Sequence, residues 1–228
     1  MSDTRNATVS MSEPVSRSAI GVVDGHVRRG WEVGAGVSTA RLTLRDESPL
    51  AKVVVRGPFA GAVRSALGVG FGRTTRTDVP GVGQVLVVGA GPGEWIVLGP
   101  VGTGARLLGD LNERLSGTGE FASAVDITHG RALVRLHGPD ARRTLAKVCG
   151  IDLDDRATPD GSALRTSVAR IVTDLVRDDR DGEPSYLLHC ERSSGQFLAD
   201  MLLDAGTEFG VEVTGFEAGP ATVAEGAR

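Results

Sequence analysis

The chain has 228 residues, of which 40% are hydrophobic, a proportion that argues for a folded protein with a sizeable core. Its formal net charge is −4 at pH 7 and no run of Lys and Arg forms a basic stripe, which argues against a nucleic-acid-binding protein. No apolar run approaches the length of a membrane span, and the polar N-terminus lacks a signal-peptide core, so we expect a cytoplasmic protein with no membrane partner.

The N-terminal part of the chain carries weak structural signals. Residues 1–18 are rich in Ser, Thr and Glu, a composition typical of a flexible arm. Residues 19–48 predict an irregular segment with one short strand in ARLTLR. From residue 51 the pattern sharpens, since AKVVVRGP predicts a strand that Gly57-Pro58 ends. FAGAVRSALG then predicts a helix that the proline opens and Gly68 stops, with an inward face of Phe59, Ala62, Val63, Ala66 and Leu67.

One segment is similar in pattern to the strand and glycine-rich turn of a dinucleotide-binding enzyme, namely QVLVVGAGPGEWIVLGP at residues 84–100. However, Glu94 occupies the third glycine position of G-x-G-x-x-G, where a carboxylate would repel pyrophosphate. The following WIVL is a β-type run instead of a helix, and Asp110, about where a ribose-binding carboxylate is needed, falls inside a leucine-striped helix. The sequence therefore favours a hairpin turned by GAGPG, with Trp95 as a core anchor.

The second half of the chain repeats the first. ALVRLHGP at 132–139 followed by DARRTLAKVCG again predicts a strand, a Gly-Pro turn and a helix. PSYLLHCERSSGQFLADMLLDAGTEFG repeats the strand, loop and helix of EWIVLGPVGTGARLLGDLNERLSG, and Ser193–Gln196 has capping-box spacing. The predicted inward residues are Leu107, Leu108, Leu111 and Leu115, then Ala141, Leu145 and Val148 before a stop at Gly150, and finally Phe197, Leu198, Met201, Leu202 and Ala205.

The two copies are not of equal length. The Gly-Pro pairs are 81 residues apart, whereas Trp95 and Tyr186 are 91 residues apart, so we expect about ten extra residues in the turn VRDDRDGEP. We predict an α+β protein of two diverged β-α-β-β-α repeats with mixed or antiparallel sheets. The expected organisation is a flexible arm (1–18), a first half (19–120), a second half (121–217) and a C-terminal tail (218–228).

The densest polar group between apolar segments is DITHGR, residues 126–131. Two interpretations are open. Asp126 and His129 could form an acid–base pair, or Asp126 and Thr128 could bond to the backbone of a turn while His129 begins a strand. The sequence favours the turn.

Other candidate ligands are poorly arranged for chemistry. His189 and Cys190 are adjacent on a predicted strand, so they point to opposite faces and cannot readily share a metal. Asp152, Asp154 and Asp155 lack the spacing of a calcium loop and are typical of a solvated turn. We therefore expect no catalytic, cofactor-binding or metal-binding residues on this chain.

ESPLAKVVVRG (47–57), GPGEWIVLGP (91–100) and especially DITHGRALVRLHGPDARRTLAKVCGIDL (126–153) resemble the gamma subunit of heterotetrameric bacterial sarcosine oxidase, over roughly residues 47–210. The resemblance implies the tandem-domain fold of the aminomethyltransferase (T-protein) and YgfZ group. It also implies a non-catalytic subunit that packs mainly against the alpha subunit, in a complex with beta and delta subunits. That complex oxidises sarcosine to glycine, a one-carbon unit and hydrogen peroxide, with FAD, FMN, NAD, tetrahydrofolate and zinc on the partner subunits.

The alternative is a stand-alone folate-binding protein of the T-protein or YgfZ kind. Relatives that use folate carry a paired-acid motif on the hairpin, where this sequence has GAGPGEW. Folate chemistry on this chain is therefore disfavoured, and a shared fold alone does not transfer an activity.

Overall fold

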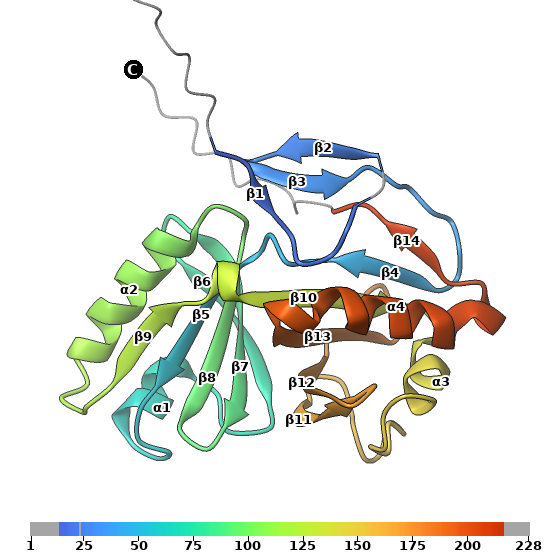
Figure 1. The fold of residues 1–228 in the computed structure, drawn as a ribbon. Coiled ribbons are helices and arrows are strands. Elements are labelled where there is room, and N and C mark those ends of the chain that lie inside the picture. Colours follow the sequence, from blue (N-terminus) through green and yellow to red (C-terminus); the bar gives the residue numbers. More distant parts are fainter. Residues whose placement is uncertain (1–13, 23, 217–228) are drawn as a thin grey trace, which may run out of the picture.

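The computed structural model describes residues 14–22 and 24–216, which form two large sheets, each with helices on its outer face, and a small N-terminal sheet (Figure 1). The expected tail at 218–228 and residues 1–13 of the expected arm lie outside the described residues. Further along that arm, β1 (Ser16–Arg17) pairs with β3 (Trp31–Gly34), which also forms a hairpin with β2 (Gly25–Arg28).

The first large sheet has the strand order β6-β7-β8-β5-β9, and all of its neighbouring strands are antiparallel. α1 (Ala62–Leu67) and α2 (Gly104–Ser116) cover one face, where their apolar side chains share a core with Trp95. Leu107, Leu111 and Leu115 are buried as predicted. The strands are β5 (Ala51–Arg56), β6 (Thr74–Val79), β7 (Gly83–Gly91), β8 (Glu94–Gly99) and β9 (Ser123–Asp126).

The second large sheet has the order β11-β12-β13-β10-β4-β14, with α3 (Ala141–Ala146) and α4 (Gly195–Gly206) packed on its outer face. Only the β14–β4 pair is parallel among the described strands of this sheet. Its strands are β4 (Thr43–Asp46), β10 (Arg131–His137), β11 (Ala163–Val168), β12 (Ile171–Arg177), β13 (Ser185–Glu191) and β14 (Glu212–Thr214), and three short 3₁₀ segments are η1 (Thr128–Gly130), η2 (Arg192–Ser194) and η3 (Thr207–Phe209).

The inner faces of the two sheets pack against each other. Leu86, Ile96 and Leu98 of the first sheet share an apolar cluster with Leu133 and Leu187 of the second. The molecule therefore has four layers, namely helices, sheet, sheet and helices. Because β7 and β8 contact helices on one side and a sheet on the other, they are apolar at nearly every position instead of alternating.

The strand registers confirm the internal repeat. Val55 pairs with Trp95 in the first sheet, and Leu136 pairs with Tyr186 in the second. Leu136 lies 81 residues after Val55 and Tyr186 lies 91 residues after Trp95, so residues at the predicted offsets occupy equivalent positions in the two sheets. Each repeat contains one strand more than the predicted β-α-β-β-α plan. The additional strand is β6, between α1 and β7, in the first repeat and β11, between α3 and β12, in the second. Short, polar sequences such as TTRTDV carry little strand signal, which explains why they were missed.

The position predicted for the extra residues was wrong. Thr74 at the start of β6 pairs with Val88, and Ala163 at the start of β11 pairs with Val176. Ala163 therefore lies 89 residues after its equivalent Thr74, whereas the Gly-Pro pairs before α1 and α3 are only 81 residues apart. Most of the insertion therefore lies in the loop between α3 and β11, and only a small part in the VRDDRDGEP turn.

Two strands belong to the sheet on the other side of the boundary expected at residue 120. β4 precedes β5 in the chain, yet it pairs with β10 of the second sheet, while β9 follows α2 and returns to pair with β5 of the first. The halves 19–120 and 121–217 therefore do not coincide with the two sheets.

Three details of the predicted helices were also wrong. α1 begins at Ala62, so Phe59 lies in the preceding loop and is exposed, and Ala62 and Ala66 face solvent. α4 buries Leu198 and Leu202 but leaves Phe197 exposed at the border of its apolar face. The capping box does not form, because Gln196 Oε1 instead accepts a hydrogen bond of 2.6 Å from the Gly21 amide.

Candidate functional site

The glycine-rich segment is a β-hairpin, as predicted, and Pro92 and Gly93 form its turn. Gly93 has a φ of +71°, and a Cβ atom on Gly89 would lie 2.0 Å from the Gly70 carbonyl oxygen. These glycines therefore permit a tight turn and the close approach of a neighbouring loop. No helix follows the turn, so it lacks the helix N-terminus that a pyrophosphate site requires.

Glu94, at the start of β8, begins a chain of charged contacts between the sheets. Its carboxylate accepts hydrogen bonds from Arg56 Nε at 2.9 Å and Arg165 Nη2 at 2.6 Å. Partial burial would raise the pKa of Glu94, but the two arginines outweigh it and hold the pKa below its usual value. Both carboxylate oxygens are thus engaged by this protein's own side chains.

The chain of contacts continues to a buried histidine. Arg165 Nε lies 2.7 Å from Asp174 Oδ1, and Asp174 Oδ2 lies 3.0 Å from His189 Nδ1. Burial lowers the pKa of His189 more than Asp174 raises it, so the imidazole is neutral at pH 7 with its proton on Nδ1. An Asp–His pair can orient a general base, but Nε2 has no hydrogen-bond partner among the described residues. No side chain among the described residues therefore stands at Nε2 as a nucleophile for the pair to activate.

A second buried network surrounds Arg135 on β10. Its guanidinium contacts Glu47 at 2.9 Å, Asp178 at 2.9 Å and Ser185 Oγ at 2.7 Å. Asp178 also pairs with Arg76 from the first sheet. These contacts join the two sheets and the segment that links β4 to β5.

Lys52 on β5 is completely buried, and its Nζ donates to the carbonyl oxygens of Ser48 at 2.6 Å and Leu50 at 2.8 Å. Burial lowers its pKa to about 7, although Asp46 and Asp126 favour the charged form. The lysine thereby holds the segment through which the chain crosses from the second sheet to the first. The sequence reasoning missed this group, and the available signal was a charged residue inside the apolar strand AKVVVR.

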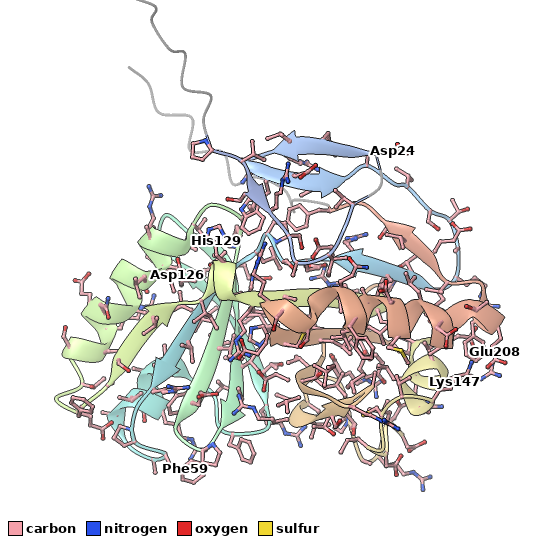
Figure 2. The ribbon with its side chains drawn as sticks, viewed as in Figure 1. Asp24, Phe59, Asp126, His129, Lys147 and Glu208 are labelled. Atoms are coloured by element: carbon pink, nitrogen blue, oxygen red, sulfur yellow. The ribbon has the colours of Figure 1, made fainter. Side chains whose placement is uncertain are left out.

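Asp126 and His129 form a structural turn, the interpretation that the sequence favoured (Figure 2). Asp126 Oδ1 accepts a hydrogen bond of 2.8 Å from the Thr128 amide, and Thr128 Oγ1 accepts one of 2.9 Å from the Lys52 amide. The His129 ring stacks on Trp31, with the ring centroids 4.9 Å apart. The carboxylate and the imidazole are therefore occupied separately and do not act as a pair.

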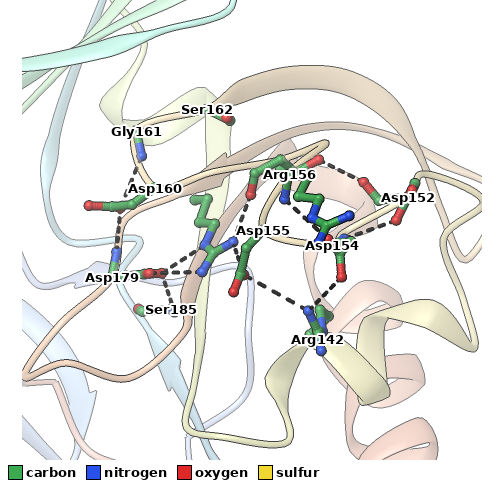
Figure 3. A network of polar contacts seen from close by, with 12 residues as sticks. Arg142, Asp152, Asp154, Asp155, Arg156, Asp160, Gly161, Ser162, Asp179 and Ser185 are labelled. Atoms are coloured by element: carbon green, nitrogen blue, oxygen red, sulfur yellow. Dashed lines mark hydrogen bonds and ion pairs between the residues drawn. The ribbon is translucent and has the colours of Figure 1, made fainter.

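The acidic cluster caps its own loop, which is the insertion between α3 and β11 (Figure 3). Asp152 Oδ1 accepts from the Asp154 amide and Asp154 Oδ1 from the Arg156 amide, at 2.9 and 3.1 Å. Asp155 pairs with the guanidinium of Arg177 at 2.7 Å. Hydrogen bonds to the backbone and ion pairs with two arginines, Arg177 and Arg142, thus account for the three carboxylates.

His189 and Cys190 point to opposite faces of β13, as predicted, since Cys190 packs in the core beneath α3 and α4 whereas His189 contacts Asp174. The part of the chain that the structure describes holds no group of three or more His, Cys, Asp or Glu residues placed to bind a metal ion. Within residues 14–22 and 24–216, no helix is long and apolar enough to cross a membrane.

Comparison with known proteins identifies relatives that cover most of the chain. Residues 80–226 match the family model of the GCVT N-terminal domain. The sarcosine oxidase gamma subunit of Arthrobacter sp. is 31% identical over 182 residues, which cover 76% of this chain and 84% of that subunit.

Two solved structures share the fold. The heterotetrameric sarcosine oxidase from Corynebacterium sp. U-96 contains a chain with 28% identity and a TM-score of 0.62, and the match covers 76% of this protein and 88% of that chain. Aminomethyltransferase T of the glycine cleavage system from Bartonella henselae, at 18% identity, has a TM-score of 0.67 over 84% of this protein and 55% of its own chain. The chain belongs to the GCVT N-terminal domain family and to the family of sarcosine oxidase gamma subunits.

Proposed function

We propose that this chain is the non-catalytic gamma subunit of a heterotetrameric sarcosine oxidase complex in the cytoplasm. The observation that carries the proposal is the 31% identity over 84% of the Arthrobacter gamma subunit. The complex oxidatively demethylates sarcosine to glycine, a one-carbon unit and hydrogen peroxide. This chain acts in its assembly, mainly against the alpha subunit, together with beta and delta subunits. FAD, FMN, NAD, tetrahydrofolate and zinc are bound by those partners.

The contacts that the polar side chains make within the chain support a structural role. Glu94, His189 and Lys52 have the chemistry of catalytic groups, but each is tied to neighbouring groups of the same fold. Their contacts join two sheets or fix a connecting segment. We propose that such residues hold the subunit in one shape for its partners and take no part in the reaction.

The GCVT family and the aminomethyltransferase fold favour a second candidate, a stand-alone folate-binding protein of the T-protein or YgfZ kind. Glu94 is the carboxylate on the hairpin at which folate-using relatives carry their paired acids. Arg56 and Arg165 already occupy both of its oxygens. The residues present therefore do not fit a folate amine at this position, and we derive no step through folate.

The purified chain tests the proposal directly. We expect it to be colourless and to produce no hydrogen peroxide from sarcosine, and we expect it to co-purify with a larger flavin-containing complex when it is expressed with the other three subunits. A tightly bound flavin in the isolated chain would contradict the proposal. Saturable binding of tetrahydrofolate in calorimetry would instead support the second candidate.

A further inference from the structure

Three of the six phenylalanines of this chain are exposed at one end of the first unit. Phe59 precedes α1, Phe71 follows it and Phe121 follows α2, with 55%, 53% and 95% of their surfaces exposed. The three rings together expose on the order of 400 Å² of apolar surface, at about 200 Å² for a whole phenylalanine. An apolar patch of this size on a small protein commonly marks an interaction site.

The segments that carry the rings flank an open hollow of about 500 Å³ next to α1 (Figure 2 labels Phe59). Phe59 lies two residues before its first lining residue, Phe71 directly follows its last, and Phe121 adjoins Glu120, which contacts α1. The hollow is lined by Gly61, Arg64, Ser65, Gly68, Val69 and Gly70.

The loops that carry the rings are held in place by hydrogen bonds. Trp95 Nε1 donates to the Val69 carbonyl oxygen at 3.0 Å, which anchors the loop before Phe71. The Glu120 carboxylate accepts from the Ala62 and Val63 amides at 3.0 and 2.9 Å, which anchors the loop that carries Phe121. A preformed surface loses little conformational entropy when it binds a partner.

The patch carries one charged side chain, that of Arg64, which the described residues leave without an ion pair. Glu120, next to Phe121, is acidic, but its carboxylate already accepts hydrogen bonds from the Ala62 and Val63 amides. Arg64, which lines the hollow, is exposed, and no carboxylate of the described residues lies within ion-pair distance of it. Aromatic residues and arginine are the types most enriched at interfaces. The complementary surface is therefore apolar with at least one carboxylate.

We propose that the aromatic patch, defined as Phe59, Arg64, Phe71 and Phe121, docks this chain onto an apolar, acidic surface of a larger subunit of the complex. This inference rests on the proposed function, which supplies the partner. A second copy of the chain fits less well, because a two-fold contact centred on the patch would bring two Arg64 side chains together, while the nearby Glu120 carboxylates are already bound to amides of α1.

A second open hollow, of about 630 Å³, lies on the other unit and provides a matched control. Phe197 borders it and is 50% exposed, which is close to the value for Phe59. Its lysine, Lys147, is already paired with Glu208 at 2.6 Å, whereas Arg170, which also lines it, is exposed and has no ion pair among the described residues. The control therefore resembles the patch in charge and differs from it in having one exposed phenylalanine instead of three.

The test uses the full-length chain co-expressed with the other subunits, and measures how much of it elutes with the flavin-containing complex in size-exclusion chromatography. We expect Phe121→Ser and Arg64→Glu each to weaken association by about tenfold or more, and Phe59→Ser combined with Phe121→Ser to abolish it. Phe197→Ser is expected to assemble like the wild type. Circular dichroism of each isolated variant checks that it is folded.

The outcomes separate the inference from the proposed function. If the wild-type chain joins no complex, the proposed function fails and this inference fails with it. If the wild type assembles and the patch variants assemble equally well, only this inference is overturned. It is also overturned if Phe197→Ser loses assembly as the patch variants do, or if the isolated wild type is a dimer that Phe121→Ser converts to a monomer without affecting the complex.

Discussion

Replacing Lys52 by methionine removes a buried ammonium group while keeping a side chain of similar length. The folded state lowers the pKa of Lys52 from 10.5 to about 7, chiefly through burial. Between these two values the unfolded chain binds more protons than the folded chain. The stability that neutral Lys52 contributes is therefore fully present above pH 10.5 and is lost as the pH falls towards 7.

The size of the effect follows from the two pKa values. At about 1.4 kcal/mol per pKa unit, the free energy of unfolding of the wild type should rise by about 2.5 kcal/mol relative to Lys52→Met between pH 7.5 and 9.5. Because both proteins share all other titrating groups, the difference isolates this lysine. Methionine also leaves two carbonyl oxygens unpaired, but that cost does not depend on pH.

Urea unfolding followed by circular dichroism at a series of pH values measures the difference. Lys147→Met is the matched control, since Lys147 is the only other lysine in the sequence and its side chain is partly exposed. A difference between wild type and Lys52→Met that stays constant from pH 7.5 to 9.5 would refute the assignment of Lys52 as a buried, readily deprotonated group.

Three further predictions use the same unfolding measurement. Arg135→Ala leaves the buried Glu47 carboxylate unpaired and removes one partner of the buried Asp178, and should cost about 3–5 kcal/mol, whereas Arg142→Ala, which breaks a surface ion pair, should change little; equal effects would contradict the buried network. Gly89→Ala should destabilise by about 1–3 kcal/mol through its clash with a carbonyl oxygen, while Gly109→Ala, open to solvent in α2, should stabilise by about 1 kcal/mol. Because burial lowers the pKa of His189 below 6.5, its contribution is lost as the pH falls below that value, so the wild type should lose more stability than His189→Gln between pH 7 and 5.

Local patterns predicted the repeated elements well. The alternation and length of AKVVVR and ALVRLH, and the leucine spacing of α2, depend on residues close in sequence, and the structure forms these elements as expected. The hairpin at residues 83–99 was likewise predictable, because Glu94 and the β-type run after it contradict a phosphate-binding turn.

Pairings between distant segments were not predictable in the same way. Nothing local to β4 indicates that it pairs with β10, about ninety residues later, instead of with its neighbour β5. The exposure of Phe59 and Phe197 was not predicted, for a related reason. A helical pattern indicates which residues share a face, but not where the helix begins or which residues at the border of that face contact the rest of the protein.

The buried charges explain how two apolar sheet faces keep one relative position. Hydrophobic contacts such as those of Leu86 and Leu187 are non-directional and would tolerate a shift of one sheet over the other. The Glu94–Arg165 and Arg76–Asp178 pairs each join the first sheet to the second, and any shift would leave a charge unpaired in a partly buried position. Such pairs need not add net stability, but they penalise alternative packings strongly. A subunit whose task is to present a fixed surface gains from that penalty, because a displaced sheet would also displace the loops that carry its aromatic patch.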